Sequence, residues 1–333
     1  MKILYFSPLE NACTYFRCTL PARHLKLQNL ADTRIVHTVA KEYFDWADIV
    51  VIQRSVGELM EKVAKYCKLV GKKVVYELDD NIFCYPDSVE YVKSDLQEQT
   101  ISAIKILRQC HAVTATTQGI ADTVKELVDI PVYVLSNYLD FNDLKGLDVQ
   151  SRRSSEGGNF FIGWAGGHYH VQDLTLIESA LMAVMKRYPD VQAIFYGDCP
   201  KKLLEVFPQR VFYQPWTGLE DFYLQMSIFR FDIGLAPLFG TEFAKSRSPL
   251  RLLQYATLGI PTIGSNCGEY GRMLGNGMPG ILAEDGEWVD KLSWAIEHPE
   301  ERKAMAEKAK EYVRDNYGIA KNVHKWMEVY ETI

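Results

Sequence analysis

Two arginines four residues apart, Arg247 and Arg251, lie beside a predicted helix start. Ser248 is a residue type preferred at helix N-caps, and Pro249 is favoured at the first helical position, so a helix is predicted over 248–258. A helix N-terminus presents free backbone N–H groups and a partial positive charge, which attract anions. The arginines would add charge and further donors, so the segment is suited to a diphosphate. The alternative is a pair of solvated arginines on a surface helix.

Gln254 follows on the same predicted helix. It shares a face with Arg251, because residues three apart are neighbours on a helix surface. Gly259 marks the predicted end of the helix. The stretch 254–261, QYATLGIP, resembles the donor-binding helix of GT-B glycosyltransferases, particularly the retaining family called GT4. In that family Glu-Ala-x-Ala-x-Gly-x-Pro leads into a strand that ends in Ser, as the strand here ends at Ser265.

The resemblance implies roles for this segment. Arg247 and Arg251 would hold the donor phosphates and Gln254 would hold the ribose, with Ser248 at the helix N-terminus. The family usually has two Glu residues separated by seven others, and these positions are Ser246 and Gln254 here. Gln keeps an oxygen that can accept a bond from a ribose hydroxyl, but it loses the charge. The sugar-contacting Glu has no direct equivalent, so the identity of the sugar stays open.

A glycine-containing loop at 163–174 follows a predicted strand and opens a predicted helix. Gly166 and Gly167 allow the backbone to approach a ligand closely. The loop lacks the GxGxxG pattern of dinucleotide-binding sites. A subset of the resembling transferases has Gly-Trp-Ala-Gly and His-x-x-Asp at this place, and His170 falls near a position where the family carries a phosphate-binding Lys. The alternative is that His170 caps the helix or is structural.

Arg17 and Tyr213 complete the predicted donor site. In GT-B enzymes the first loop is often rich in glycine and faces the donor phosphates. The loop here, within 7–25, has no Gly, and Arg17 could supply charge instead. Tyr213 or Trp216 could pack against the nucleobase. The alternatives are a surface arginine before a helix and aromatic side chains that belong to the core.

Two adjacent carboxylates, Asp79 and Asp80, follow a predicted strand in the sequence YELDDNIF at 76–83. In an extended chain neighbouring side chains point to opposite faces, so at most one is expected to enter a ligand site. Such a carboxylate could orient or deprotonate an acceptor hydroxyl. It could also bind a metal together with Asn81, or only cap a loop. The Asp-x-Asp metal motif of the other major glycosyltransferase fold is absent from this segment.

The elements that position these residues alternate along the chain. In the first half strands are predicted over 2–6, 48–52, 72–80, 112–117 and 132–137, and helices over 19–29, 57–69, 95–110 and 119–128. In the second half strands are predicted over 160–166, 191–197, 231–237 and 261–265, and helices over 172–187, 218–229 and 248–258. Strands joined by helices form parallel sheets covered on both faces. The fold class is therefore α/β, with two Rossmann-like doubly wound parallel-sheet domains that face a central cleft, as in GT-B proteins.

A polar stretch, VQSRRSSEGGN at 149–159, separates the two series. The predicted domains are an N-terminal acceptor-side domain over 1–148 and a C-terminal nucleotide-sugar-binding domain over 149–312. Residues 313–333 are predicted to form a C-terminal helix. GT-B chains commonly end in a helix that crosses back to the N-terminal domain, and a plain packing helix is the alternative.

The composition is that of an ordinary globular protein, with 47% hydrophobic and 24% charged residues among 333. The net charge of −6 disfavours non-specific binding of nucleic acid. The seven cysteines include no CxxC pair, which gives no support to a zinc or redox motif and indicates a reducing, cytoplasmic location. No apolar run approaches ~18 residues, so no transmembrane segment is expected.

These patterns, with the resemblance, predict a glycosyltransferase that moves a hexose or related sugar from a nucleotide-diphosphate sugar, with UDP expected as the nucleotide and GDP as the other candidate. The resemblance implies that the anomeric configuration of the sugar is retained. The reaction is expected to need no obligatory metal or other cofactor. The acceptor is open between a glycan, a lipid-linked sugar, a protein, a small molecule and a modified nucleic-acid base. The alternatives are a non-catalytic nucleotide-sugar-binding protein of the same fold, and a phosphorylase or epimerase.

Overall fold

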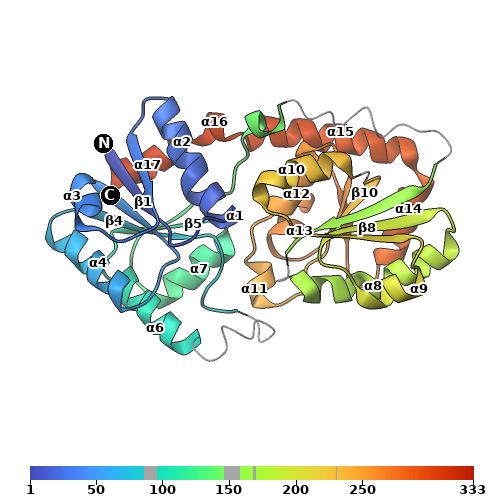
Figure 1. Ribbon diagram of the computed structural model, residues 1–333, viewed down its shortest axis with the longest axis horizontal. Coiled ribbons are helices and arrows are strands. Elements are labelled where there is room, and N and C mark those ends of the chain that lie inside the picture. Colours follow the sequence, from blue (N-terminus) through green and yellow to red (C-terminus); the bar gives the residue numbers. More distant parts are fainter. Residues whose placement is uncertain (86–95, 146–157, 168–169, 230) are drawn as a thin grey trace. The chain divides into compact units, whose positions relative to one another are not determined.

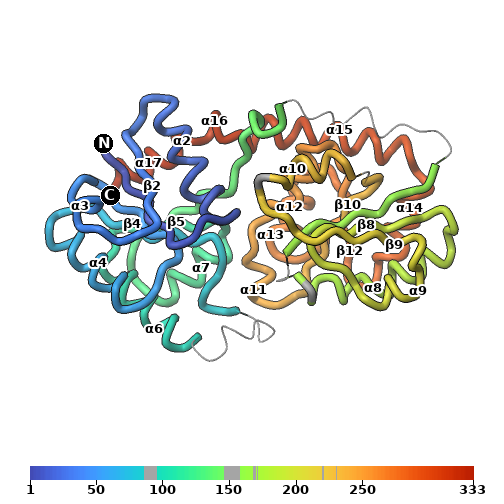
Figure 2. Tube along the Cα trace, in the orientation of Figure 1, coloured from blue at the N-terminus to red at the C-terminus, as the bar shows by residue number. Residues whose placement is uncertain are grey.

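The computed structural model describes residues 1–85, 96–145, 158–167, 170–229 and 231–333, which form two compact units (Figure 1). Unit 1 contains Met1–Asp140, Thr241–Ser248 and Tyr317–Ile333. Unit 2 contains Phe141–Gly240 and Pro249–Asn316. Unit 1 therefore contains three separate segments of the chain. Figure 2 follows the path of the chain by colour, from blue at the N-terminus to red at the C-terminus. The predicted boundary at 148–149 lies outside the described residues.

The sheet of unit 1 has six parallel strands in the order β2-β1-β3-β4-β5-β6. The strands are β1 (Lys2–Phe6), β2 (Asp32–Val36), β3 (Ile49–Gln53), β4 (Lys73–Leu78), β5 (Ala112–Ala115) and β6 (Val132–Val134). Every residue of β3, IVVIQ, is buried, as expected for a strand covered on both faces. The edge strand β2, DTRIV, has no fully buried residue and no apolar run that would have predicted it.

Helices cover both faces of this sheet. The helices of this unit are α1 (Ala12–Thr14), a π-helical turn (Tyr15–Thr19), α2 (Leu20–Leu27), α3 (Lys41–Trp46), α4 (Glu58–Leu69), α6 (Leu96–Leu107), α7 (Gln118–Leu127), α16 (Ile319–Asn322) and α17 (His324–Thr332), together with the short α11 (Glu242–Lys245). One apolar core joins the sheet to α3, α4, α6 and α7. On the opposite face Tyr5 of β1 meets Tyr330 of α17, with 3.1 Å between their hydroxyl oxygens.

The sheet of unit 2 also has six parallel strands, in the order β12-β11-β10-β7-β8-β9. The strands are β7 (Phe160–Ala165), β8 (Val191–Gly197), β9 (Val211–Pro215), β10 (Ile233–Ala236), β11 (Thr262–Ser265) and β12 (Ile281–Ala283). Its helices are α8 (Val171–Arg187), α9 (Lys201–Val206), α10 (Leu219–Ile228), α12 (Leu250–Thr257), α13 (Gly268–Gly275), α14 (Trp288–Glu297) and α15 (Pro299–Asn316), and a 3-10 turn spans Phe141–Leu144. One core packs α8 and α14 against the sheet, and a second packs α10 and α12 against the other face.

In each sheet the chain adds strands on one side of its first strand and then crosses over to add the later strands on the other side. The strand order therefore reverses direction next to the first strand. The reversal lies between β1 and β3 in unit 1 and between β7 and β10 in unit 2. Ligands of open α/β sheets bind at such a point, beyond the carboxyl ends of the strands. The predicted α/β class with two doubly wound parallel sheets is confirmed. No helix in the described part of the chain combines the length and apolar character needed to cross a membrane.

Candidate functional site

The helix α12 begins two residues later than predicted. Pro249 occupies the N-cap position, and no side chain caps the helix. The prediction that Ser248 caps it is wrong, because the Ser248 hydroxyl instead accepts a hydrogen bond of 2.9 Å from Asn137 Nδ2 in unit 1. The predicted exit at Gly259 is confirmed: this residue has a left-handed backbone, with φ of 64°, which glycine adopts without a steric penalty.

Arg251 and Gln254 are both buried on α12, with 7% and 9% of their surfaces exposed. The Arg251 guanidinium lies over the Trp164 ring at 5.2 Å, and its Nη1 is buried without a hydrogen-bond acceptor among the described residues. Gln254 lies three residues further along the same helix and adds a buried carboxamide to this face. A buried donor without an acceptor is costly, so the arrangement indicates a place for an anionic or polar ligand.

The loop after β7 lies against this arginine. An added Cβ at Gly166 would lie 2.6 Å from Arg251 Nη2 and 2.7 Å from an atom of the Trp164 ring. No described atom comes within 4 Å of the corresponding position at Gly167. The Tyr255 hydroxyl accepts a 2.8 Å hydrogen bond from the backbone N–H of Ala165, which ties α12 to the end of β7. The glycine loop and Arg251 therefore meet at the point where the strand order of unit 2 reverses.

His170 stands at the N-cap position of α8, but its side chain does not cap the helix. Its Nδ1 lies 2.7 Å from Asp173 Oδ2, and its ring meets the Trp164 ring edge-on at 6.2 Å. The other oxygen of Asp173 accepts a 2.8 Å hydrogen bond from the Phe239 N–H, just beyond β10. Asp173 thus joins α8 to the loop after β10, and it orients His170 beside the ring on which Arg251 stacks.

The segment Thr241–Ser248 belongs to unit 1, where three polar side chains hold it. Thr117 Oγ1 donates to the Ser246 carbonyl at 2.7 Å, and Asn81 Nδ2 donates to Ser246 Oγ at 3.2 Å. Together with Asn137, these donors follow the carboxyl ends of β4, β5 and β6. Arg247 lies in this segment, with its guanidinium over the Phe243 ring at 5.1 Å. The two arginines of the predicted diphosphate site are therefore assigned to different units.

Asp79 and Asp80 both contact one guanidinium. Arg54 Nη1 lies 3.3 Å from Asp79 Oδ2 and 3.2 Å from Asp80 Oδ2. The opposite-face geometry that was expected for an extended chain does not apply to these residues, because β4 ends at Leu78 and the chain bends at both aspartates. Burial and the charge of Asp79 raise the pKa of Asp80, while Arg247 and Arg54 oppose that shift. Sequence reasoning missed Arg54, although its place just after the buried strand β3 is a usable signal.

Arg17 is fully buried within the π-helical turn. Its Nε lies 2.7 Å from Glu77 Oε1, and its Nη1 donates to the Leu135 carbonyl at 2.7 Å and to Asn137 Oδ1 at 3.1 Å. The interpretation as a surface arginine is wrong, because these partners enclose it. The contacts bind the first loop to β4 and to the segment after β6.

Tyr213 lies in β9 with 45% of its surface exposed, and its hydroxyl donates to the Gly197 carbonyl at 3.4 Å. Trp216 is 39% exposed and stacks on Tyr196, with 4.9 Å between ring centres. Both rings keep an exposed part that a nucleobase could contact. No group of three or more His, Cys, Asp or Glu side chains that could hold a metal ion occurs among the described residues.

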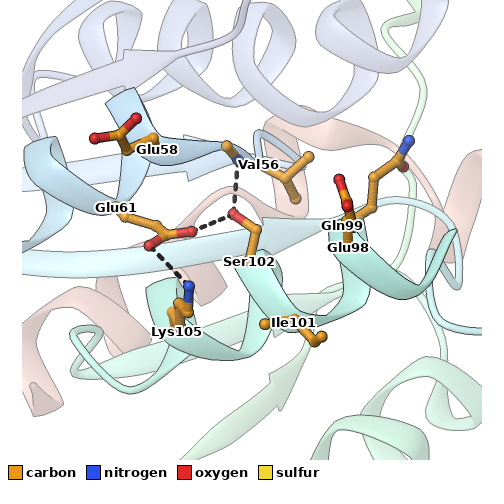
Figure 3. Close-up of a pocket in the computed structure, with 9 residues that line it drawn as sticks. Val56, Glu58, Glu61, Glu98, Gln99, Ile101, Ser102 and Lys105 are labelled. Atoms are coloured by element: carbon orange, nitrogen blue, oxygen red, sulfur yellow. Dashed lines mark hydrogen bonds and ion pairs between the residues drawn. The ribbon is translucent and has the colours of Figure 1, made fainter. Parts of the chain in front are cut away.

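A hollow of about 440 Å³ opens between α4 and α6 in unit 1 (Figure 3). Ser102 connects the two helices: its hydroxyl donates to Glu61 at 2.7 Å and accepts from the Gly57 N–H at 2.7 Å. Lys105 lies 3.6 Å from the same Glu61 carboxylate. None of the site residues predicted from the sequence lines this hollow.

Comparison with known proteins identifies the fold of the chain but does not assign it to a family. No family model matches the chain. A curated relative, a trehalose synthase of Pyrococcus horikoshii, is 34% identical over 76 residues, which are 22% of this chain and 18% of that protein. The match therefore covers well under two thirds of the relative.

Solved structures match over the whole chain at low sequence identity. The Anabaena protein Alr3699/HepE in complex with UDP-glucose gives a TM-score of 0.73 at 15% identity, with both chains fully covered. A glycosyltransferase of Rickettsia africae gives 0.69 at 12% identity and covers 99% and 98% of the two chains. A UDP-GlcNAc 2-epimerase of Neisseria meningitidis bound to UDP-GlcNAc gives 0.58 at 13% identity over both whole chains. These likenesses establish the GT-B fold.

Proposed function

We propose that the protein is a glycosyltransferase that takes a sugar from a nucleotide-diphosphate sugar bound in unit 2. The observation that carries this proposal is Arg251, a buried guanidinium with an unsatisfied Nη1 at the reversal point of the sheet. A buried cation needs an anionic partner, and a diphosphate supplies one that matches the planar donor groups of arginine. The proposal is supported by the fold, which proteins solved with UDP-sugars share.

The remaining donor contacts follow from the same site. Gln254 would accept a hydrogen bond from a ribose hydroxyl, and His170 would contact the phosphates from the glycine loop. Tyr213 or Trp216 would pack on the base. UDP is the expected nucleotide because a whole-chain structural neighbour was solved with UDP-glucose, and GDP is the other candidate.

In the proposed reaction the bond between the anomeric carbon and the diphosphate oxygen breaks, and an acceptor oxygen bonds to that carbon. Arg251 would stabilise the negative charge that develops on the leaving diphosphate. Asp79 or Asp80 would orient the acceptor hydroxyl or take its proton. Retention of configuration and independence from a metal ion remain parts of the proposal, and activity retained after treatment with EDTA is the expected result for the latter.

Titration of the purified protein with UDP, UMP and uridine tests the donor site. Replacing Arg251 by Ala removes a charge-assisted hydrogen bond worth about 1.5–3 kcal/mol, so UDP affinity should fall roughly 10- to 100-fold. Uridine affinity should change little. Arg187→Ala is the control, because Arg187 is exposed in the same unit and pairs with Glu297. Equal UDP affinity in wild type and Arg251→Ala would remove this residue from the site.

Product analysis separates transfer from the epimerase alternative, because 2-epimerases are also among the structural neighbours. A transferase releases UDP from UDP-glucose faster when an acceptor is present, whereas a 2-epimerase converts UDP-GlcNAc without any acceptor. A protein that binds UDP-sugars without either change would be the non-catalytic alternative, which the Ser246 and Gln254 departures from the GT4 pattern motivate.

A further inference from the structure

A small hollow lies in unit 1 at the reversal point between β1 and β3. It has a volume of about 50 Å³, which exceeds the space one water molecule needs. Its polar lining comes from the last residue of β3 and from the segments that follow the two strands: Ser7, Asn11, Cys13, Thr14, Gln53 and Arg54. The hollow therefore occupies the place where open α/β sheets bind ligands. Pro8 and Leu9 complete its wall, which presents hydroxyl, amide, thiol and guanidinium groups beside apolar surface.

Arg54 reaches this hollow from a backbone conformation that is rare for a residue with a side chain. Its φ is 40°, in the left-handed region. The backbone N–H of Arg54 donates to the Glu77 carbonyl at 2.9 Å, which fixes the turn. In this conformation one nitrogen, Nη1, contacts both Asp79 and Asp80. A strained residue persists only where its surroundings enforce it, and such residues concentrate at ligand sites.

Asp79 provides an independent sign of a ligand. Only 7% of its surface is exposed, and its Oδ1 has no hydrogen-bond donor among the described residues. Buried carboxylate oxygens are normally satisfied by donors. Asp79 is connected to the hollow through Arg54, which lines it and lies 3.3 Å from Asp79 Oδ2. Burial, the charge of Asp79 and a side-chain hydrogen bond to it raise the pKa of the Cys13 thiol, which also lines the hollow, well above its ordinary value. The Oδ1 atom, on a carboxylate held by an arginine of the hollow, is suited to a ligand hydroxyl.

The charges around the hollow are balanced. Arg54 faces two carboxylates, and Arg247 adds a second positive charge that acts on Asp80. Two arginines and two aspartates sum to zero. An anionic ligand group would meet two carboxylates whose cations are already engaged, and a cationic group would meet the Arg54 guanidinium. A neutral group that both donates and accepts hydrogen bonds avoids both penalties.

We propose that Arg54 is a positioning residue that holds Asp79 and Asp80 at this hollow, and that the hollow binds an uncharged, hydroxyl-bearing group of the acceptor. The inference rests on the proposed transferase function and deepens it, because it assigns the chemical class of the acceptor. Arg54 acts by holding the two carboxylates, so its positive charge matters more for ligand binding than the planar arrangement of its guanidinium N–H donors. A lysine ammonium, which can also contact two carboxylates, should replace it in part.

Saturation-transfer NMR with three probes of one ring type tests this inference: methyl α-glucoside, glucose 6-phosphate and glucosamine. Wild type should give the strongest signal with the neutral glucoside. Arg54→Gln should reduce that signal about tenfold, the effect of losing one charge-assisted hydrogen bond, and Arg54→Lys should restore part of it. Arg108→Gln is the control, because Arg108 is exposed on the same unit.

Asp80→Asn provides a variant that does not depend on the strained backbone. It leaves the cluster with one excess positive charge, so the glucose 6-phosphate signal should rise relative to the neutral glucoside. UDP affinity is measured in parallel for every variant and should stay at the wild-type value. Absence of UDP binding by wild type would defeat the proposed function. Three results, each with normal UDP binding, would overturn this inference and leave the proposed function standing. They are no signal from the glucoside, signals from the charged probes as strong as that of the glucoside, and a glucoside signal that is unchanged in Arg54→Gln.

Discussion

At Gly166 the neighbouring side chains of Arg251 and Trp164 leave no room for a Cβ atom. A Cβ there would lie 2.6 Å from Arg251 Nη2 and 2.7 Å from the Trp164 ring, and the ring belongs to the core. Gly166→Ala should therefore destabilise unit 2 by about 1–3 kcal/mol, as other overpacking substitutions do. It should also weaken UDP binding, because Arg251 must move. Urea unfolding and UDP titration measure the two effects.

Gly167→Ala is the matched control for that prediction. The neighbouring glycine has no described atom within 4 Å of the added Cβ, and its φ is not in the left-handed region. Stability and UDP affinity should both stay close to those of wild type. Equal effects of the two alanines would show that loop flexibility matters, and not the contact with Arg251.

The buried pair of Arg17 and Glu77 gives a second prediction for single residues. Both side chains are almost completely enclosed, at 0% and 1% exposure, and Thr114 Oγ1 donates to the other Glu77 oxygen at 2.5 Å. Glu77→Gln leaves the Arg17 charge without its counter-charge, and breaking such a pair costs about 3–5 kcal/mol.

Urea unfolding of Glu77→Gln, of Arg17→Met and of the double variant Arg17→Met/Glu77→Gln checks this expectation. The double variant removes the unpaired charge, so it should be less destabilised than the sum of its single changes. Strict additivity would indicate that the two side chains do not depend on each other for stability.

Among the elements, α12 shows how a local signal determines a helix end. Gly259 has a φ of 64°, and the Ile260 N–H donates to the Tyr255 carbonyl at 2.8 Å across it. Gly259→Ala places a Cβ in the left-handed region and should cost about 1–2 kcal/mol of unit 2 stability. Gly259→Asn should cost less, because Asn tolerates this conformation better. The order of the urea midpoints, wild type above Asn above Ala, is the expected result.

The start of the same helix shows where local signals fail. Ser248 and Pro249 have the preferred residue types for a cap and a first turn, yet Ser248 bonds to Asn137 and Pro249 takes the cap position. A hydroxyl can bond to one of several partners, and the partner here is more than a hundred residues away in sequence. In the same way, β2 is not predicted from its residues because an edge strand needs no continuous apolar run.

At the scale of the whole molecule, the last 17 residues of the chain pack as part of unit 1. Tyr317–Ile333 belongs to that unit, and its buried apolar side chains are Ile319, Val323, Trp326, Met327, Val329 and Tyr330. Burial of a large apolar side chain contributes about 1.5–3 kcal/mol. The sum is comparable to the total stability of a domain, roughly 5–15 kcal/mol. Removal of 317–333 should therefore unfold unit 1.

Hydrogen exchange followed by mass spectrometry locates that effect. Peptides from β1 and β3 should lose protection in the truncated chain, whereas peptides from β8 and α14 should keep it. Removal of only 331–333, where two of the three residues are exposed, is the control and should leave both units protected. Protection of β1 unchanged by the long truncation would contradict the assignment of the tail to unit 1.

The sequence by itself determined the α/β class, most of the strands and helices, and the α12 exit. These properties depend on apolar periodicity and turn residues within about ten positions, and such patterns are visible along the chain. It also identified Arg251, Gly166 and the two aspartates as chemically capable groups.

Only the tertiary structure decided which of these groups share a site. Arg247 and Arg251 are four residues apart, yet the first belongs to unit 1 and acts on Asp80, while the second stacks on Trp164 in unit 2. Arg54 joins the aspartates although the whole of α4 and β4 lies between them in the chain. Such groupings depend on strand order and on long-range packing, which bring distant residues together and which no local pattern specifies.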